Sequence, residues 1–140
     1  MSVFVVDVSV AVKWMLPEPL AREAARLQSP THQLHAPSFF EMELANVLWK
    51  KVRQGLVSRD QADVFLSQVP GLPIARHSDN SLIAAAFDIA NRAGRTVYDC
   101  IYLALAVRLG GQMATADERF VNSLASTPWA TFAIHLRNIP

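Results

Sequence analysis

The strongest constraint on the fold is an unbroken apolar run near the start of the chain that ends in an acidic residue. The run is Val3–Val6, and Asp7 follows it directly. A short, continuous run rich in β-branched residues is typical of a parallel strand that is covered on both faces. In open α/β sheets, ligands bind just beyond the carboxyl ends of such strands. Asp7 would lie at that position, so it is the first candidate for a functional residue.

The rest of the chain alternates short apolar strands with helices, which predicts the α/β class. Further strands are expected at about 33–36, 72–76, 113–116 and 131–136. Helices are expected at about 8–16, 20–27, 39–54, 58–68, 79–93, 100–109 and 118–124. This alternation predicts a parallel sheet with right-handed crossovers.

Length and composition add further expectations. The 140 residues are 51% hydrophobic, which predicts a single domain over 1–140 with a sizeable core. The net charge of +1 neither requires nor excludes a polyanionic partner. The one cysteine, Cys100, excludes an internal disulfide and argues against a cysteine-based zinc site, which fits a reducing cytoplasm. Asp7 interrupts the first apolar run, so no signal peptide is expected, and no run is long enough to span a membrane.

Three helix starts carry the spacing of a capping box, in which a hydroxyl and a side chain three residues later each accept a backbone amide. The pairs are Ser38 with Glu41, Ser58 with Gln61, and Thr96 with Asp99. The helix that follows Thr96 is apolar nearly all round, so it should be buried.

Four carboxylates are expected at one edge of the sheet. Asp7 and Asp117 each follow a strand. Asp99 lies in the first turn of the buried helix, where the helix dipole favours an acid, and Glu43 lies near the start of the helix at 39–54. Two unit charges ~4 Å apart repel by about 4 kcal/mol at an effective dielectric of ~20. Such a cluster needs a cation, and all-oxygen ligation selects a hard ion such as Mg²⁺ or Mn²⁺.

Each acid also has an ordinary structural interpretation. Asp7 could cap the next helix, and Asp99 could be only the fourth residue of its capping box. Asp117 could be a turn residue, and Glu43 could lie on a solvated helix face. The joint placement of the four acids favours a shared site.

Four blocks of sequence together form a specific pattern. They are Val5–Trp14, Glu43–Leu48, Val97–Ala106 and Thr115–Phe120. In these blocks the chain resembles the PIN domain family, and within it the VapC-type toxins of bacterial toxin–antitoxin pairs. The blocks occur in family order and span nearly the whole chain, whereas the segment at about 55–95 matches only in pattern.

This resemblance implies a three-layer α/β/α sandwich with a central, mostly parallel sheet. It implies an Mg²⁺-dependent endoribonuclease that acts as a toxin, an antitoxin protein that blocks the site, and a toxin homodimer. The acidic positions of the family are matched by Asp7, Glu43, Asp99 and Asp117.

The chemistry assigns each acid a role. A carboxylate-bound metal lowers the pKa of a bound water and neutralises charge in the transition state. Asp7 and Asp99 are expected to contact the metal directly, and Asp117 to bind a metal or a metal-bound water. Glu43 would orient the attacking water or help to hold a second ion.

Neighbouring polar and basic residues extend this hypothesis. Ser9 and Thr115 could cap or turn the chain, or they could hydrogen-bond a metal-bound water. Phosphate contacts supply much of the affinity for RNA. The basic candidates for such contacts are Lys13, Lys50, Lys51, Arg53, Arg59, Arg95 and Arg119.

Glu41 and Glu43 are expected to differ. Successive residues of an α-helix are about 100° apart, so the two side chains point roughly 200° apart. Glu41 should act locally in the capping box with Ser38, whereas Glu43 should face the acidic site.

Other functional classes fit the sequence less well. A phospho-acceptor receiver domain needs an acidic pair beside the first strand and a lysine on the last, and an aspartate-nucleophile phosphatase needs Asp-x-Asp after the first strand. Here Asp7 stands alone, and the strand at 131–136 carries no lysine. The remaining alternative is a non-catalytic PIN-like module that binds RNA or protein.

Overall fold

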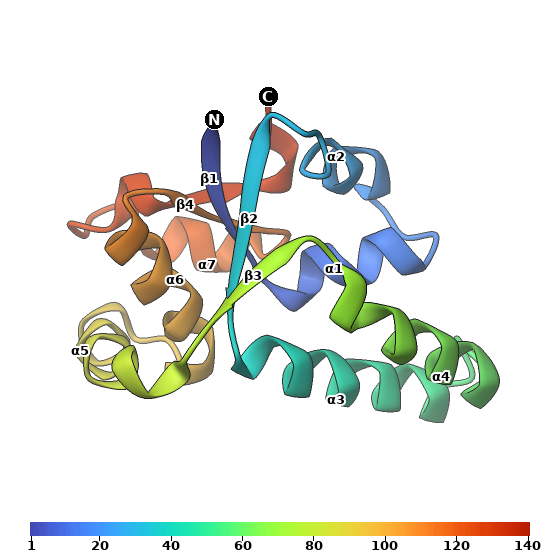
Figure 1. Ribbon diagram of the computed structural model, residues 1–140. Coiled ribbons are helices and arrows are strands. Elements are labelled where there is room, and N and C mark those ends of the chain that lie inside the picture. Colours follow the sequence, from blue (N-terminus) through green and yellow to red (C-terminus); the bar gives the residue numbers. More distant parts are fainter.

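The computed structural model describes residues 1–140 and contains one five-stranded sheet (Figure 1). The strands are β1 (Ser2–Val6), β2 (His32–Pro37), β3 (Ile74–His77), β4 (Gln112–Thr115) and β5 (Ala133–His135). The helices are α1 (Val8–Met15), α2 (Ala21–Arg26), α3 (Phe39–Arg53), α4 (Arg59–Gln68), α5 (Ile83–Ala93), α6 (Val97–Leu109) and α7 (Glu118–Ser123). All neighbouring strands are parallel, which confirms the predicted α/β class.

Helices cover both faces of the sheet and make the three-layer sandwich that was predicted. Figure 1 shows α5 and α6 on one side and α1 to α4 on the other. Successive strand residues point to opposite faces, so a strand buried at consecutive positions must be covered twice. Phe4, Val5 and Val6 are all at most 3% exposed, as this arrangement requires. In α6 every residue from Cys100 to Ala106 is buried. No helix of the chain is long and apolar enough to cross a membrane.

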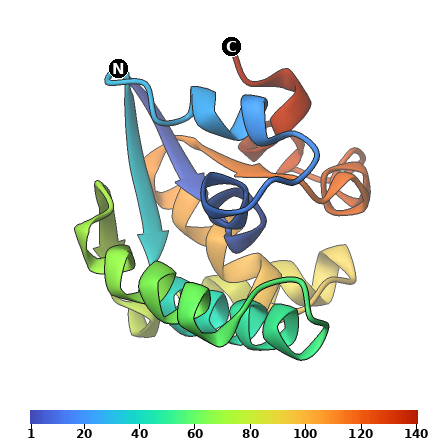
Figure 2. The ribbon, with the colours of Figure 1, turned by 90° about the vertical axis from the view of Figure 1, so that its right-hand side faces the viewer.

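The strand order places the candidate site. The order is β3-β2-β1-β4-β5, so the chain builds one half of the sheet outward from β1 and then returns to β1 to add β4 on its other side. The carboxyl ends of β1 and β4 therefore flank the point where the order reverses, which is where open α/β sheets bind ligands. Asp7 and Asp117 lie at those two ends. Figure 2 shows α1 at the same edge, above α3 and α4.

The start of α3 differs from the prediction. Ser38 has helical backbone angles and caps no amide; its hydroxyl instead donates to the carbonyl oxygen of His77 at 2.9 Å. The first amide of α3 donates to the carboxylate of Asp79, 2.9 Å away. Glu41 pairs with Arg76 of β3 at 3.1 Å. The predicted Ser38–Glu41 capping box is wrong because a distant segment supplies the cap.

Other element ends follow the sequence more closely. Ser58 and Gln61 form the predicted capping box at the start of α4, and the Thr96 hydroxyl accepts the amide of Asp99 at 3.1 Å. The last strand is shorter than predicted, because β5 covers Ala133–His135 and 3₁₀ turns flank it on both sides.

Candidate active site

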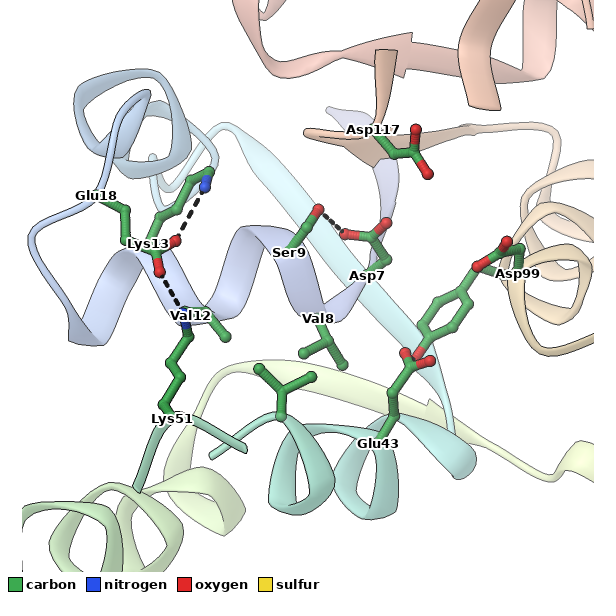
Figure 3. Close-up of a pocket in the computed structure, with 12 residues that line it drawn as sticks. Asp7, Val8, Ser9, Val12, Lys13, Glu18, Glu43, Lys51, Asp99 and Asp117 are labelled. Atoms are coloured by element: carbon green, nitrogen blue, oxygen red, sulfur yellow. Dashed lines mark hydrogen bonds and ion pairs between the residues drawn. The ribbon is translucent and has the colours of Figure 1, made fainter. Parts of the chain in front are cut away.

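The four acids predicted from the sequence line one cleft of about 320 Å³ at the carboxyl edge of the sheet (Figure 3). The cleft is lined by Asp7, Val8, Ser9, Val12, Lys13, Glu18, Glu43, Val47, Lys51, Asp99, Tyr102 and Asp117. The acids reach it from four places, namely the ends of β1 and β4, the second turn of α3 and the first turn of α6. The fold therefore brings all four together, as the topology predicted.

Asp7 is held by two hydroxyls. It stands at the N-cap position of α1, but its side chain caps no amide. The Ser9 hydroxyl donates to Oδ1 at 2.5 Å, and the Thr115 hydroxyl donates to Oδ2 at 2.6 Å. The same hydroxyl oxygens accept the amides of Ala116 and Asp117 at 3.0 and 3.1 Å. Capping alone therefore does not account for Asp7, because Ser9 and Thr115 fix its carboxylate against the end of β4.

The environment of Asp7 disfavours its charge. Burial raises the pKa of this carboxyl to about 6, the hydrogen bonds from Ser9 and Thr115 oppose the rise, and the negative charge of Asp99 adds to it. Above this pKa the group is charged in surroundings that penalise the charge. A cation in the cleft would offset that penalty.

Glu43 is positioned by a tyrosine that sequence reasoning missed. The hydroxyl of Tyr102 donates to Oε1 of Glu43 at 2.6 Å, and Tyr102 is only 1% exposed. Burial raises the pKa of Glu43, the Tyr102 hydroxyl lowers it, and Asp7 and Asp99 raise it further. Burial and the nearby Glu43 raise the pKa of Tyr102, so its hydroxyl stays protonated as a donor. Tyr102 follows Asp99 by three residues, and that helical spacing was the available signal.

Arg95 forms ion pairs with the other two acids, Asp99 and Asp117. Its guanidinium lies 3.0 Å from the carboxylate of Asp117 and 3.8 Å from that of Asp99. The second oxygen of Asp117 accepts the amide of Phe120 at 3.0 Å and so caps α7. Burial raises the pKa of Asp99; Arg95 and Thr96 oppose this, and Asp117 adds to it. Asp117 thus has a structural role in addition to facing the cleft.

The acids form a rim rather than a closed cage. As the side chains are placed, no three histidine, cysteine or acidic residues are grouped closely enough to hold a metal ion. Each carboxylate instead contacts a protein donor: hydroxyls for Asp7, Tyr102 for Glu43, and Arg95 for both Asp99 and Asp117. Carboxylates that raise one another's pKa nevertheless provide the oxygen-rich, negative donor set that a hard cation prefers.

The opposite end of the cleft is basic. Lys13 and Lys51 both contact Glu18, at 3.1 and 2.8 Å. Burial would raise the pKa of Glu18, but hydrogen bonds from Lys51 and Lys13 outweigh it and lower the pKa. The two lysines were predicted as phosphate contacts. Glu18 was missed, because it lies in a loop and carries no periodic signal.

Helical spacing explains how both ends share one cleft. The cleft face of α3 carries Glu43, Val47 and Lys51, which are four residues apart and therefore lie on one side of the helix. On α1, Ser9 and Lys13 are related in the same way. On α1, Ser9 therefore lies nearer the N-terminus than Lys13. On α3, Glu43 likewise lies nearer the N-terminus than Lys51.

The other predicted basic residues do not line the cleft. Arg53 lies over the ring of Trp49, with 5.2 Å between the guanidinium carbon and the ring centre. Arg59 pairs with Asp63 on the exposed face of α4. Lys50 and Arg119 are exposed. Of the seven candidates, only Arg95, Lys13 and Lys51 contact residues of the cleft.

Comparison with known proteins identifies the family. The PIN domain profile matches residues 4–123, a span that contains all four acids. This chain belongs to the PIN domain family. Within that family it is similar to Ribonuclease VapC3 of Pyrobaculum aerophilum, with 35% identity over 117 residues that cover 82% of this chain and 89% of the relative. The resemblance to VapC-type proteins is therefore confirmed.

Solved structures show the same PIN fold. PAE2754 from Pyrobaculum aerophilum superposes with a TM-score of 0.72 and 21% identity, over 97% of this chain and 85% of that one. A toxin–antitoxin complex from Klebsiella pneumoniae gives a TM-score of 0.60 and 16% identity, over 97% and 98% of the two chains. At these identities the likeness concerns the fold of the PIN domain.

Proposed function

We propose that this PIN domain protein is an Mg²⁺-dependent endoribonuclease that acts as the toxin of a toxin–antitoxin pair. The observation that carries the proposal is the convergence of Asp7, Glu43, Asp99 and Asp117 on one cleft at the switch point of the sheet. Family membership supports it, because the VapC relative is named a ribonuclease. The reaction would be hydrolysis of a phosphodiester bond of RNA.

Asp7 and Asp99 would hold the cation, with Mn²⁺ as a substitute for Mg²⁺, and Asp117 would bind it directly or through water. When bound, the ion supplies a water of lowered pKa and positive charge beside the scissile phosphate. Glu43 would orient the attacking water and accept its proton. Its raised pKa suits a general base, and the Tyr102 hydroxyl fixes one of its oxygens.

Two protein partners belong to the proposal. An antitoxin would block the cleft; the neighbour from Klebsiella pneumoniae, a toxin–antitoxin complex of the same fold, supports such a partner. A second copy of the chain would form a homodimer. Ile83 and Phe87 of α5 and Val107 of α6 are exposed apolar residues that could contribute to such contacts. Light scattering on the purified chain would measure its oligomeric state.

The proposed activity is tested by incubating purified protein with an RNA mixture in Mg²⁺ and, separately, in EDTA. We expect cleavage in Mg²⁺ alone, and we expect Asp7→Asn and Asp99→Asn to abolish it while the variants remain folded. Normal cleavage by either variant would remove that residue from the mechanism. RNA binding without any cleavage in Mg²⁺ would favour the alternative, a non-catalytic PIN-like binding module.

A further inference from the structure

The basic end of the cleft contains a carboxylate shared between two ammonium groups. Lys13 contacts Oε1 of Glu18 and Lys51 contacts Oε2, so each oxygen faces a different lysine (Figure 3). The three side chains are only 11–23% exposed. This group carries two positive charges and one negative charge, which leaves a net charge of +1 inside a cleft that is acidic at its other end.

The two ends are separated by an apolar stretch. Figure 3 shows Val8 between the acids and the Lys13–Glu18–Lys51 group, and Val8 is 4% exposed. At 1.5 Å per residue, the eight residues from Glu43 to Lys51 along α3 span about 12 Å. An extended polymer that binds at the acidic end therefore has room to continue over the apolar stretch to the lysines.

Glu18 is held on a stiff loop. Pro17 and Pro19 flank it, and each proline fixes its own φ near −65°. Proline also restricts the residue before it to extended backbone. The loop therefore keeps the Glu18 backbone beside the lysines, while the side chain can still rotate away. A carboxylate with one oxygen on each ammonium resembles a bound phosphate, because lysine binds a phosphate through its point charge.

We propose that Lys13 and Lys51 form a second phosphate subsite, which takes another backbone phosphate of the RNA farther along the strand than the scissile one, and that Glu18 occupies this subsite in the free protein. The inference rests on the proposed function, since it concerns the RNA that the cleft would cut. On binding, one negative charge on RNA replaces one negative charge on Glu18. Glu18 therefore lowers the affinity for RNA that reaches the lysines, because this RNA must displace the carboxylate.

The test measures binding of a fluorescent single-stranded RNA by anisotropy in EDTA, where metal-dependent cleavage cannot occur. Glu18→Gln keeps the size of the side chain and removes the competing charge, so we expect RNA to bind roughly two- to fivefold more tightly. Lys51→Met should weaken binding and reduce the slope of log affinity against log salt by about 0.7, the value for one lost contact to a single strand. Lys51→Arg should retain most of the affinity, since the charge remains.

A matched control removes a charge elsewhere. Asp88→Asn on α5 also deletes one acid from an ion pair, with Arg92, but lies outside the cleft. It should leave RNA affinity almost unchanged. If Glu18→Gln and Asp88→Asn tighten binding equally, the effect is one of net charge and the subsite is refuted.

Other outcomes separate this inference from the proposed function. If Glu18→Gln melts at a lower temperature and does not tighten RNA binding, Glu18 only joins α1 to α3 and the subsite is refuted. If the variants behave as expected but the wild type cuts no RNA in Mg²⁺, the phosphate subsite stands and the proposed nuclease activity fails.

Discussion

Replacing Asp7 with asparagine should stabilise the metal-free protein at neutral pH, although it should destroy activity. The pKa of Asp7 rises from 3.8 to about 6 in the folded protein. Because the folded pKa lies above the unfolded one, the charged carboxylate destabilises the folded state. The penalty is absent below about pH 4, grows as the pH rises, and is complete above about pH 6. A pKa shift of about two units corresponds to a change of about 3 kcal/mol in the free energy of unfolding.

The net gain should be smaller than this penalty. Ser9 and Thr115 each donate to a different oxygen of Asp7, and an amide has only one oxygen. One hydroxyl must therefore turn to accept from the new amide group, which costs about 1 kcal/mol. We expect Asp7→Asn to raise the free energy of unfolding by about 1–2 kcal/mol at neutral pH, and to lose this advantage below about pH 4.

Urea unfolding in EDTA at neutral and acid pH measures both quantities. Asp63→Asn is a matched control, because it removes an exposed aspartate that pairs with Arg59 on α4. The control should shift stability by about 0.5 kcal/mol or less at either pH. An Asp7→Asn variant that is less stable than the wild type at neutral pH, or that differs from it equally at both pH values, would refute the reasoning.

Two further comparisons use neighbouring residues as controls. Glu43→Gln should fold normally and lose most RNA cleavage. Glu41→Gln should cut RNA nearly normally and lose at most about 1 kcal/mol of stability, because only its pair with Arg76 is broken. An inactive Glu41→Gln would show that the site had been assigned the wrong glutamate. Tyr102→Phe should shift the acid limb of the cleavage pH profile to higher pH, because Glu43 loses the hydrogen bond that lowers its pKa. Tyr98→Phe, at an exposed position of the same helix, should not shift the profile.

The fold and the four acids were predictable because they depend on short-range patterns and on topology. The run Val3–Val6 predicted a buried central strand. Parallel pairing of β1 and β4 then required Asp7 and Asp117 to lie at one edge of the sheet. Helical spacing from Ser38 placed Glu43 close enough to the sheet edge to share the cleft. These inferences used only local order and the geometry of crossovers.

The failures arose where distant segments meet. Ser38 lost its predicted capping role because Asp79, forty residues away from Phe39, supplies the carboxylate for the amide of Phe39. Glu18 reaches Lys51 across 33 residues, a pairing that no local pattern indicates. Ser9 and Thr115 were correctly placed beside the acids, but the bonds between both hydroxyls and the same carboxylate depend on the register of β1 and β4.

The most direct test of the central claim is calorimetric titration of Mn²⁺ into the purified protein at neutral pH, with Asp99→Asn titrated in parallel. A carboxylate rim that assembles around a hard cation predicts saturable binding to the wild type and binding weakened by about tenfold or more in the variant, since Asp99 is one of the two proposed direct ligands. The ion should also raise the melting temperature of the wild type, and more at neutral than at acid pH, because protonated carboxyls cannot bind it. No binding, or equal binding by the wild type and Asp99→Asn, would contradict the account.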